Sequence, residues 1–376
     1  MDFSDAPAVA GFRAGLRAWL REHLDEHRDA SGYETADSVE RTLRWHRALA
    51  GAGYVGVSLP AAYGGRGLPD VYEAVVNEEL AAAAAPPPPP IGHIAHAIAD
   101  FADEDLKARV LPSLVGCEEV WCQGFSEPGA GSDLAGISTT ATPDGDRFVV
   151  NGQKIWTSGA MWSRWCLLLA RTEAGLPRHR GLSMLVVDME TPGVDRREIV
   201  LAGGSREFAE VFFDDVAVPA ANLVGERGQG WLIAMHMLAY ERGPADMGWV
   251  GRLGRVLAGA RDDVRSGRVT AGAPLRHRLA AAAVDVQVMQ WHVTRSLANR
   301  AADSTGSGGS VDKLLATRVE QNLYRVTADL AGSSFTVGPP GPFADYLWSR
   351  AQSIYGGTQQ IQRQIVAQRV LGLPRG

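Results

Sequence analysis

The sequence predicts an α+β protein built from three parts: a helical N-terminal domain at residues 1–119, a middle β domain at 120–222 and a helical C-terminal domain at 223–376. Three observations support this division. Apolar residues recur at helical spacing through the first part. Near Val120 the pattern changes to short β-rich runs separated by Gly, Pro and charged residues. From about Trp231 the helical pattern returns and continues to the end, over a length that suits a four-helix bundle.

The N-terminal helices are predicted from the spacing of their apolar residues. The first helix has an apolar stripe at positions i, i+4, i+7, i+8 and i+12, formed by Phe12, Leu16, Trp19, Leu20 and Leu24. Similar spacing predicts further helices at 42–52, 71–85, 91–101 and 105–114. The run PPPPP at 86–90 cannot continue a helix, so we expect a stiff, extended break there.

The middle part is predicted to consist of strands. Residues 146–156 read DRFVVNGQKIW, two β-rich runs joined by Asn151-Gly152, and an Asn-Gly pair in this position is a strong signal for a hairpin turn. Further strands are predicted at 165–172, 181–189 and 209–219. In the last part, we expect the helices to be interrupted where Gly, Ser and Pro gather, at 304–310 and 337–342.

Composition and absent motifs narrow the classes of function. Charged residues make up 21% of the chain and hydrophobic residues 45%, and the net charge is −6 without a block of Lys or Arg, which disfavours nucleic acid and anionic membranes as partners. No window of about twenty apolar residues is free of Pro or charge, which disfavours a membrane span. Neither GxGxxG after a strand nor GxxxxGK(S/T) occurs, so a Rossmann or P-loop nucleotide site is not predicted.

The cysteines and the start of the chain bear on its compartment. Cys117, Cys122 and Cys166 are too few and too unevenly spaced for a disulfide framework or a structural zinc site. The start, MDFSDAPAVAG, does not resemble a signal peptide. We therefore expect a reduced, cytosolic protein. His93 and His96 lie three residues apart without a third ligand nearby, so no metal site is predicted.

Two stretches of the middle part suggest chemistry. Residues 123–136, QGFSEPGAGSDLAG, form a glycine-rich loop whose exposed backbone N–H groups can approach a flat ring or an anion. Residues 152–160, GQKIWTSGA, place the hydroxyls of Thr157 and Ser158 directly after the aromatic face of Trp156. Taken alone, the first stretch also suits a long turn, and the second suits a core Trp in a sheet. Their occurrence together favours a binding site.

These two stretches resemble the flavin loops of the acyl-CoA dehydrogenase family. The resemblance extends to EVFFDDVAVPAANLVGERGQGW at 210–231 and to IYGGTQQIQRQIVAQRVLGLP at 354–374, in the order and at the distances typical of the family. It implies a helical N-terminal domain, a middle β-barrel or sandwich, and a C-terminal four-helix bundle, with FAD bound between the last two. It also implies the α,β-dehydrogenation of an acyl thioester, carried by coenzyme A or by an acyl carrier protein.

The resemblance implies roles for individual residues. Gln123, Phe125 and Ser126 would line the isoalloxazine ring, with the Phe125 backbone and the Ser126 hydroxyl at its polar edge. Trp156 would pack on the ring and Ser158 would reach the side of its N5 atom. The remaining implied contacts are Thr358 and Gln360 to the flavin, Arg276 or Arg278 to the pyrophosphate, and Ser132 to the thioester or pantetheine arm.

The base that removes the α-proton departs from the common pattern. Much of the family carries it in a YEGT motif, but this chain has Tyr355-Gly356-Gly357-Thr358, and glycine cannot accept a proton. A subset places a Glu on the first helix of the C-terminal domain, directly before an Arg. Glu241-Arg242 fits this subset, and the apolar stretch WLIAMHMLAY before it would keep the carboxylate dry. The alternative is an ion pair on the helix surface.

The same resemblance suggests how the substrate is held. Arg242 would bind the pantetheine or phosphate part, and the Gly356 N–H would polarise the thioester oxygen. Because Gly356 has no side chain, a branched or bulky acyl group would fit beside it. The expected electron acceptor is an electron-transferring flavoprotein, and the expected assembly is a homodimer or a tetramer.

Two stretches that reach the FAD of a neighbouring subunit in relatives are altered here, to PLRHRLAAAAVDVQ at 274–287 and ADLAGSSFTVGPPGP at 328–342. Contact with FAD across subunits therefore stays open, as does a heteromer in which this chain supports a partner. An oxygen-using oxidase or monooxygenase of the same fold is a further alternative.

Overall fold

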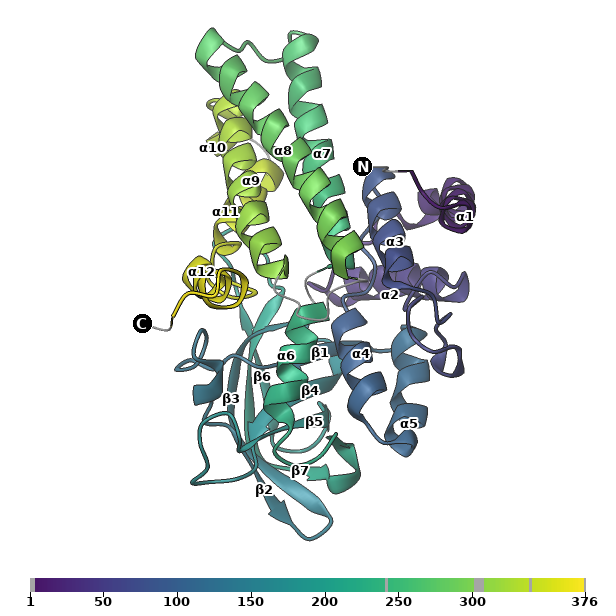
Figure 1. Cartoon of the computed structure of the whole chain (residues 1–376), viewed down its shortest axis with the longest axis vertical. Coiled ribbons are helices and arrows are strands. Elements are labelled where there is room, and N and C mark those ends of the chain that lie inside the picture. The colour runs from purple at the N-terminus through teal and green to yellow at the C-terminus, as the bar shows by residue number, and fades with distance from the viewer. Residues whose placement is uncertain (1–3, 241–242, 301–307, 338–339, 375–376) are drawn as a thin grey trace.

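The computed structural model describes residues 4–240, 243–300, 308–337 and 340–374. Figure 1 shows a helical N-terminal part packed beside a β-sheet, with long helices extending from the sheet. The predicted α+β class is confirmed. Among the described residues, no helix combines the length and the apolar character that crossing a membrane requires.

The N-terminal part is a cluster of helices around a buried core that includes Trp45 and Leu49. Its helices are α1 (Pro7–His23), α2 (Ala36–Gly51), α3 (Asp70–Ala82), α4 (Gly92–Phe101) and α5 (Glu104–Val115). As predicted, prolines 86–90 are not helical. The Trp45 indole N–H donates to the carbonyl oxygen of Pro86 at 3.1 Å, which holds this extended segment against α2.

The middle part is one eight-stranded sheet. The strands are β1 (Val120–Gly124), β2 (Thr140–Asp144), β3 (Arg147–Ser158), β4 (Ser163–Arg171), β5 (Leu182–Asp188), β6 (Val194–Ile199), β7 (Phe208–Pro219) and β8 (Leu223–Val224). They follow the order β6-β7-β3-β2-β4-β5-β8, and β1 pairs in parallel with β4. Strand β1 also contacts β3, so the two strands lie in the same region of the sheet.

The hairpin turn predicted at Asn151-Gly152 is wrong. Strand β3 runs unbroken through this pair, and the turn between β2 and β3 is made by Gly145, at φ = +63°. Asn151-Gly152 instead forms a bulge, where the pairing of β3 with β7 shifts register between Val150 and Gly152. Gly152 has φ = +147°, and a Cβ there would lie 2.5 Å from Thr139 Oγ1, so glycine is needed for close packing rather than for a turn.

The C-terminal part is helical. Its helices are α6 (Gly230–Tyr240), α7 (Pro244–Arg265), α8 (Ala273–Arg300), α9 (Gly308–Ala331), α10 (Ser334–Val337), α11 (Pro340–Ala351) and α12 (Gln359–Ile365). Helices α7, α8, α9 and α11 pack as a bundle, whereas α6 packs on α4 and on β5. Of the interruption expected at 337–342, Val337 still belongs to α10 and α11 already begins at Pro340, at a position where proline suits a helix N-terminus; residues 338–339 lie outside the described residues.

Candidate active site

A buried ion pair anchors the loop that follows β1. The side chain of Lys154, on β3, has no exposed surface, and its Nζ donates to Glu127 Oε1 at 2.8 Å and to the carbonyl oxygen of Phe125 at 3.1 Å. Glu127 also accepts hydrogen bonds from the Ser138 N–H (2.6 Å), the Ser138 hydroxyl (2.8 Å) and the Thr139 N–H (2.9 Å). These contacts fix the loop against β3 and against the segment that leads into β2.

Burial and ion pairing act on this pair in opposite directions. Burial lowers the pKa of Lys154 to about 8, although Glu127 favours its charged form. Burial alone would raise the pKa of Glu127, but the charge of Lys154 and the hydrogen bonds that the carboxylate accepts outweigh it and lower the pKa to about 2. Glu127 is therefore ionised at neutral pH and is poorly suited to act as a base.

Trp156 lies near the end of β3 with its side chain at the surface. Its backbone has φ = +61°, a left-handed conformation that costs a non-glycine residue about 1–2 kcal/mol. The residue is 54% exposed, although large aromatic side chains usually gain by burial. One residue earlier, the Ile155 N–H donates to the carbonyl oxygen of Ser126 at 2.9 Å, so the loop after β1 and the end of β3 lie side by side. Ser158 is exposed as well.

Three further aromatic residues continue from Trp156 into the C-terminal part. Phe208, at the start of β7, meets Trp156 edge to face, with ring centroids 6.1 Å apart. Trp348 of α11 stacks on Phe208 at 5.7 Å, and Tyr355 lies 6.1 Å from Trp348. We call Trp156, Phe208, Trp348 and Tyr355 the aromatic wall. It connects the sheet to the segment that precedes α12.

The segment that precedes α12 is shaped by two glycines in left-handed conformations. Gly356 has φ = +61° and Gly357 has φ = +89°. Thr358 caps α12, because its hydroxyl accepts a hydrogen bond from the Ile361 N–H at 3.3 Å. The buried side chain of Gln362 donates to the carbonyl oxygen of Gly356 at 2.9 Å. This segment therefore has a fixed path beside the aromatic wall.

The remaining predicted site residues differ in location and exposure. Gln123 is half-buried on β1, whereas Ser132 and Gln360 are exposed. Arg276 is exposed near the start of α8, at the end of the bundle away from the sheet, so one chain does not bring it to the aromatic wall (Figure 1). Glu241-Arg242, the predicted base and its neighbour, lies outside the described residues.

The end of α6 is fixed by contacts with α4. Tyr240, the last residue of α6, stacks on His96 with ring centroids 4.1 Å apart and planes at 14°. One turn earlier, His236 Nε2 lies 2.7 Å from Asp100 Oδ2. Burial raises the pKa of Tyr240 to about 12 and lowers the pKa of His96, so both rings are neutral at physiological pH. The C-terminal end of α6 is therefore held in place.

Several residues of this region are not identified by the sequence. Lys154 lies inside a strand pattern and Glu127 inside a loop, 27 residues apart, and nothing in either pattern predicts that they pair. Phe208 and Trp348 are likewise distant in the chain. The signal that could have indicated Lys154 is its position: a lysine two residues before Trp156, within a strand with alternating burial.

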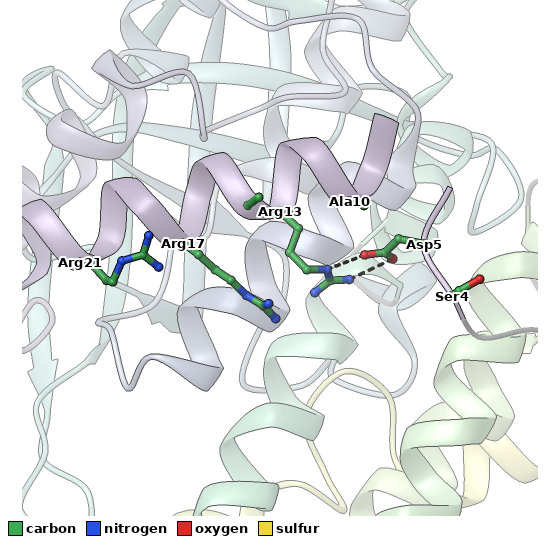
Figure 2. Close-up of a pocket in the computed structure, with 7 residues that line it drawn as sticks. Ser4, Asp5, Ala10, Arg13, Arg17 and Arg21 are labelled. Carbon is green, nitrogen blue, oxygen red and sulfur yellow. Dashed lines mark hydrogen bonds and ion pairs between the residues drawn. The ribbon is translucent and has the colours of Figure 1, made fainter. Parts of the chain in front are cut away.

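An open hollow of about 530 Å³ lies beside α1 (Figure 2), and none of its lining residues belongs to the aromatic wall. Arg13, Arg17 and Arg21 project from one side of α1 toward it. Two of these side chains are neutralised: Arg13 pairs with Asp5 and Glu79, and Arg17 pairs with Glu79, each at 2.6 Å. Glu79 belongs to α3, so these ion pairs mainly join α1 to α3.

Comparison with known proteins identifies the family. The acyl-CoA dehydrogenase N-terminal, middle and C-terminal domain models match residues 9–118, 122–216 and 228–371. The chain is 40% identical to acyl-CoA dehydrogenase IpdE1 of Mycobacterium tuberculosis over 351 residues, which cover 90% of each chain. It is 36% identical to IpdE1 of Mycolicibacterium smegmatis over 358 residues, again covering 90% of each.

Solved structures agree with this result. The structure of the Tcur3481-Tcur3483 steroid ACAD superposes with a TM-score of 0.87, at 27% identity and over 100% of both chains. The ChsE4-ChsE5 complex from Mycobacterium tuberculosis gives a TM-score of 0.85, at 26% identity and over 100% of both chains. The fold is therefore the acyl-CoA dehydrogenase fold.

The residues around the aromatic wall fit the FAD that this family uses. A flavin ring needs an aromatic or apolar face and hydrogen-bond donors at its polar edge. Trp156 offers the face, and the hydroxyls of Ser126 and Ser158 lie on the two neighbouring segments. Thr157 Oγ1, between Trp156 and Ser158, is buried and has no hydrogen-bond partner among the described residues. The chain therefore belongs to the acyl-CoA dehydrogenase family and is an FAD-dependent oxidoreductase that dehydrogenates acyl-CoA.

Proposed function

We propose that this enzyme oxidises the Cα–Cβ bond of a bulky acyl-CoA, with Glu241 as the base that removes the α-proton. The observation that carries this proposal is the segment before α12. It has glycine at 356, where much of the family has an acidic residue, and both Gly356 and Gly357 lie at positive φ. Because neither glycine can accept a proton, the base must come from another element.

Glu241 is proposed because of the helix that precedes it. Ile233, Ala234 and Met237 of α6 are buried, and α6 ends at Tyr240 against α4. A carboxylate close to such apolar surroundings has a raised pKa, which suits a base that works near neutral pH. Arg242 is proposed to bind the pantetheine or phosphate part of the substrate.

FAD, when bound, accepts the hydride that leaves Cβ. The proposed contacts with it are Gln123, Phe125, Ser126, Trp156, Ser158, Thr358 and Gln360. The Gly356 N–H is proposed to donate to the thioester oxygen, where negative charge develops as the α-proton leaves; one such donor is worth roughly 3–4 kcal/mol in other enzymes. Ser132 is proposed to lie near the pantetheine arm.

Two observations support a bulky acyl group as the substrate. Gly356 leaves space beside the acyl group, because it has no side chain. The steroid ACAD Tcur3481-Tcur3483 is 27% identical to this chain over its whole length. We therefore favour a polycyclic acyl group.

The partners are proposed on separate grounds. An electron-transferring flavoprotein is the proposed acceptor. Arg276, at the far end of the bundle, could contact a pyrophosphate only on a neighbouring chain, so the enzyme is proposed to be an oligomer. Because the similar solved structure of ChsE4-ChsE5 from Mycobacterium tuberculosis is a complex of two proteins, a heteromer is as reasonable as a homodimer or tetramer.

The experiment is anaerobic titration of the yellow protein with a panel of acyl-CoAs, from short straight chains to polycyclic ones, while flavin absorbance is recorded. Bulky substrates should bleach the flavin. Glu241→Gln should keep the yellow colour and lose bleaching, whereas the control Glu226→Gln, at an exposed position before α6, should behave as wild type. Bleaching that survives in Glu241→Gln would show that another residue is the base. Bleaching by short straight chains alone would contradict the proposed substrate.

A further inference from the structure

We propose that Lys154 is a positioning residue for the cofactor: it holds the peptide between Phe125 and Ser126 so that the Ser126 N–H faces the flavin. This role concerns FAD binding and does not depend on Glu241 as the base. It adds a function for a buried charge that the dehydrogenation chemistry does not use.

The first observation is that Lys154 is fully buried, although the core around it does not require a charged residue. A lysine with no exposed surface is rare, because its ammonium must find partners inside the protein. The stem of Lys154 passes directly under the end of β1: a Cβ on Gly124 would lie 3.5 Å from Lys154 Cγ and 2.9 Å from Cys166 Sγ. The contact with Lys154 would be an ordinary van der Waals contact, whereas Cys166 would have to shift, so glycine at 124 serves the packing of β1 beside β4.

The second observation is the choice of partners. Of the two acceptors of Lys154 Nζ, one is the carboxylate of Glu127 and the other is the main-chain carbonyl of Phe125. A buried ammonium has three N–H donors to satisfy, and here one of them is satisfied by the main-chain carbonyl of Phe125. That contact ties Lys154 to the peptide between Phe125 and Ser126, at the start of the loop that follows β1.

The third observation follows from peptide geometry. In a trans peptide the C=O and N–H groups point in opposite directions. Lys154 draws the Phe125 carbonyl toward the interior of the sheet, so the Ser126 N–H of the same peptide points away from it. The Ser126 carbonyl is occupied by the Ile155 N–H at 2.9 Å, which fixes the next peptide as well. The Ser126 N–H therefore points away from Lys154, which is the side on which the proposal places the flavin.

Glu127 holds the lysine in this position. It accepts three hydrogen bonds from Ser138 and Thr139 in addition to the one from Lys154, so its carboxylate is immobilised by the segment before β2. The pair thus fixes the loop from two sides. Glu127 therefore supports Lys154, and Lys154 orients the Ser126 N–H.

The experiment compares Glu127→Gln with Glu127→Gln/Lys154→Met. Lys154→Met alone would leave a buried, uncompensated carboxylate and could fail to fold. Glu127→Gln keeps a side-chain oxygen that can accept from Lys154 Nζ, and the lysine, whose pKa burial already lowers to about 8, can lose its proton there at modest cost. The double variant buries no charge at this place and should fold. FAD affinity is measured by adding FAD to apoprotein and following flavin fluorescence, and unfolding by urea is measured in parallel. Lys107→Met is the control, since Lys107 pairs with Glu104 on α5, away from the flavin loop.

We expect Glu127→Gln to bind FAD within about twofold of wild type, because Lys154 still reaches the Phe125 carbonyl. The double variant should bind about tenfold more weakly, the factor expected for one hydrogen bond of ordinary strength. The midpoint potential of its bound flavin should also differ from that of Glu127→Gln. If the double variant folds and binds FAD as tightly as Glu127→Gln, with the same potential, Lys154 is a structural residue only and the proposal is wrong.

Discussion

Trp348 and Phe208 stack with their ring centroids 5.7 Å apart and their planes at 14°, which joins α11 of the bundle to β7 of the sheet. On its other side, Phe208 meets the exposed Trp156 edge to face at 82°. The surface proposed for the flavin is therefore backed by residues from two parts of the chain. Packing of the bundle on the sheet and binding of FAD should depend on one another.

This relationship predicts that Trp348→Leu weakens FAD binding by roughly threefold to tenfold, because an aromatic pair contributes about 0.5–1.5 kcal/mol beyond its buried area. Flavin fluorescence during titration of apoprotein measures the effect. Phe343→Leu is a matched control on the same helix, since Phe343 pairs with Phe335 of α10 instead. Equal weakening by both substitutions would mean that α11 acts through its general stability and not through the stack on Phe208.

The sequence predicts well where the signal is local. The helical stripes predicted α1 and α3 to α5, together with the C-terminal end of α2, which begins six residues before the predicted start. The β-rich runs predicted β4, β5 and β7, because burial of one face imposes a fixed period on each element. Asn151-Gly152 shows where local signals fail. The pair suits a turn, but the pairing of β3 with β7 demands a bulge there, and Gly145 makes the turn instead.

The site was predictable only in part for a related reason. Trp156 and Ser126 belong to recognisable stretches, and the structure brings them side by side. Their supports are not recognisable, because Lys154 with Glu127, and Phe208 with Trp348, are contacts between distant segments with no pattern of their own. Such contacts depend on how the elements pack, which spacing along the chain does not specify.

A second prediction concerns an ion pair inside the bundle. Arg252 of α7 donates to Glu320 Oε1 of α9 at 2.6 Å, and Glu320 has no exposed surface. Arg252→Met should lower the free energy of unfolding by about 3 kcal/mol, because it leaves a buried carboxylate without its cation. Urea unfolding at pH 7 measures this loss.

Two further variants test the cause of that loss. Arg252→Met/Glu320→Met should recover most of the stability, since replacing both partners by apolar groups removes the buried charge. Arg318→Met, which loses an exposed pair with Asp285 at 3.5 Å, should cost less than about 1 kcal/mol. A double variant as unstable as the single one would mean that Arg252 stabilises the bundle by packing alone.

A third prediction concerns acid stability. The pKa of Glu127 is about 2 in the folded protein, below its ordinary value of 4.5. The stability that this carboxylate contributes is therefore complete above pH 4.5 and is lost as pH falls from 4.5 to 2, by about 3 kcal/mol in total. Lys154 stays protonated over this range in both states and adds no slope.

Because other carboxylates also titrate in this range, the quantity to measure is the difference between wild type and Glu127→Gln in free energy of unfolding. That difference should shrink as pH is lowered from about 5 toward about 2. A difference that stays constant with pH would show that the carboxylate of Glu127 titrates at its ordinary value and is not held by Lys154.

The last prediction tests the space beside the acyl group. Gly356→Ala adds one methyl group at φ = +61°, where an alanine is strained by about 1–2 kcal/mol. If a bulky acyl group lies against Gly356, kcat/KM should fall at least about tenfold for a polycyclic acyl-CoA and much less for butyryl-CoA, since one misplaced methylene is worth roughly 1–3 kcal/mol. Gly357→Ala, at φ = +89°, carries comparable strain and serves as the control. Backbone strain alone would lower kcat/KM for both substrates by the same factor in each variant. A change in the ratio of the two kcat/KM values that occurs only in Gly356→Ala therefore identifies contact with the acyl group.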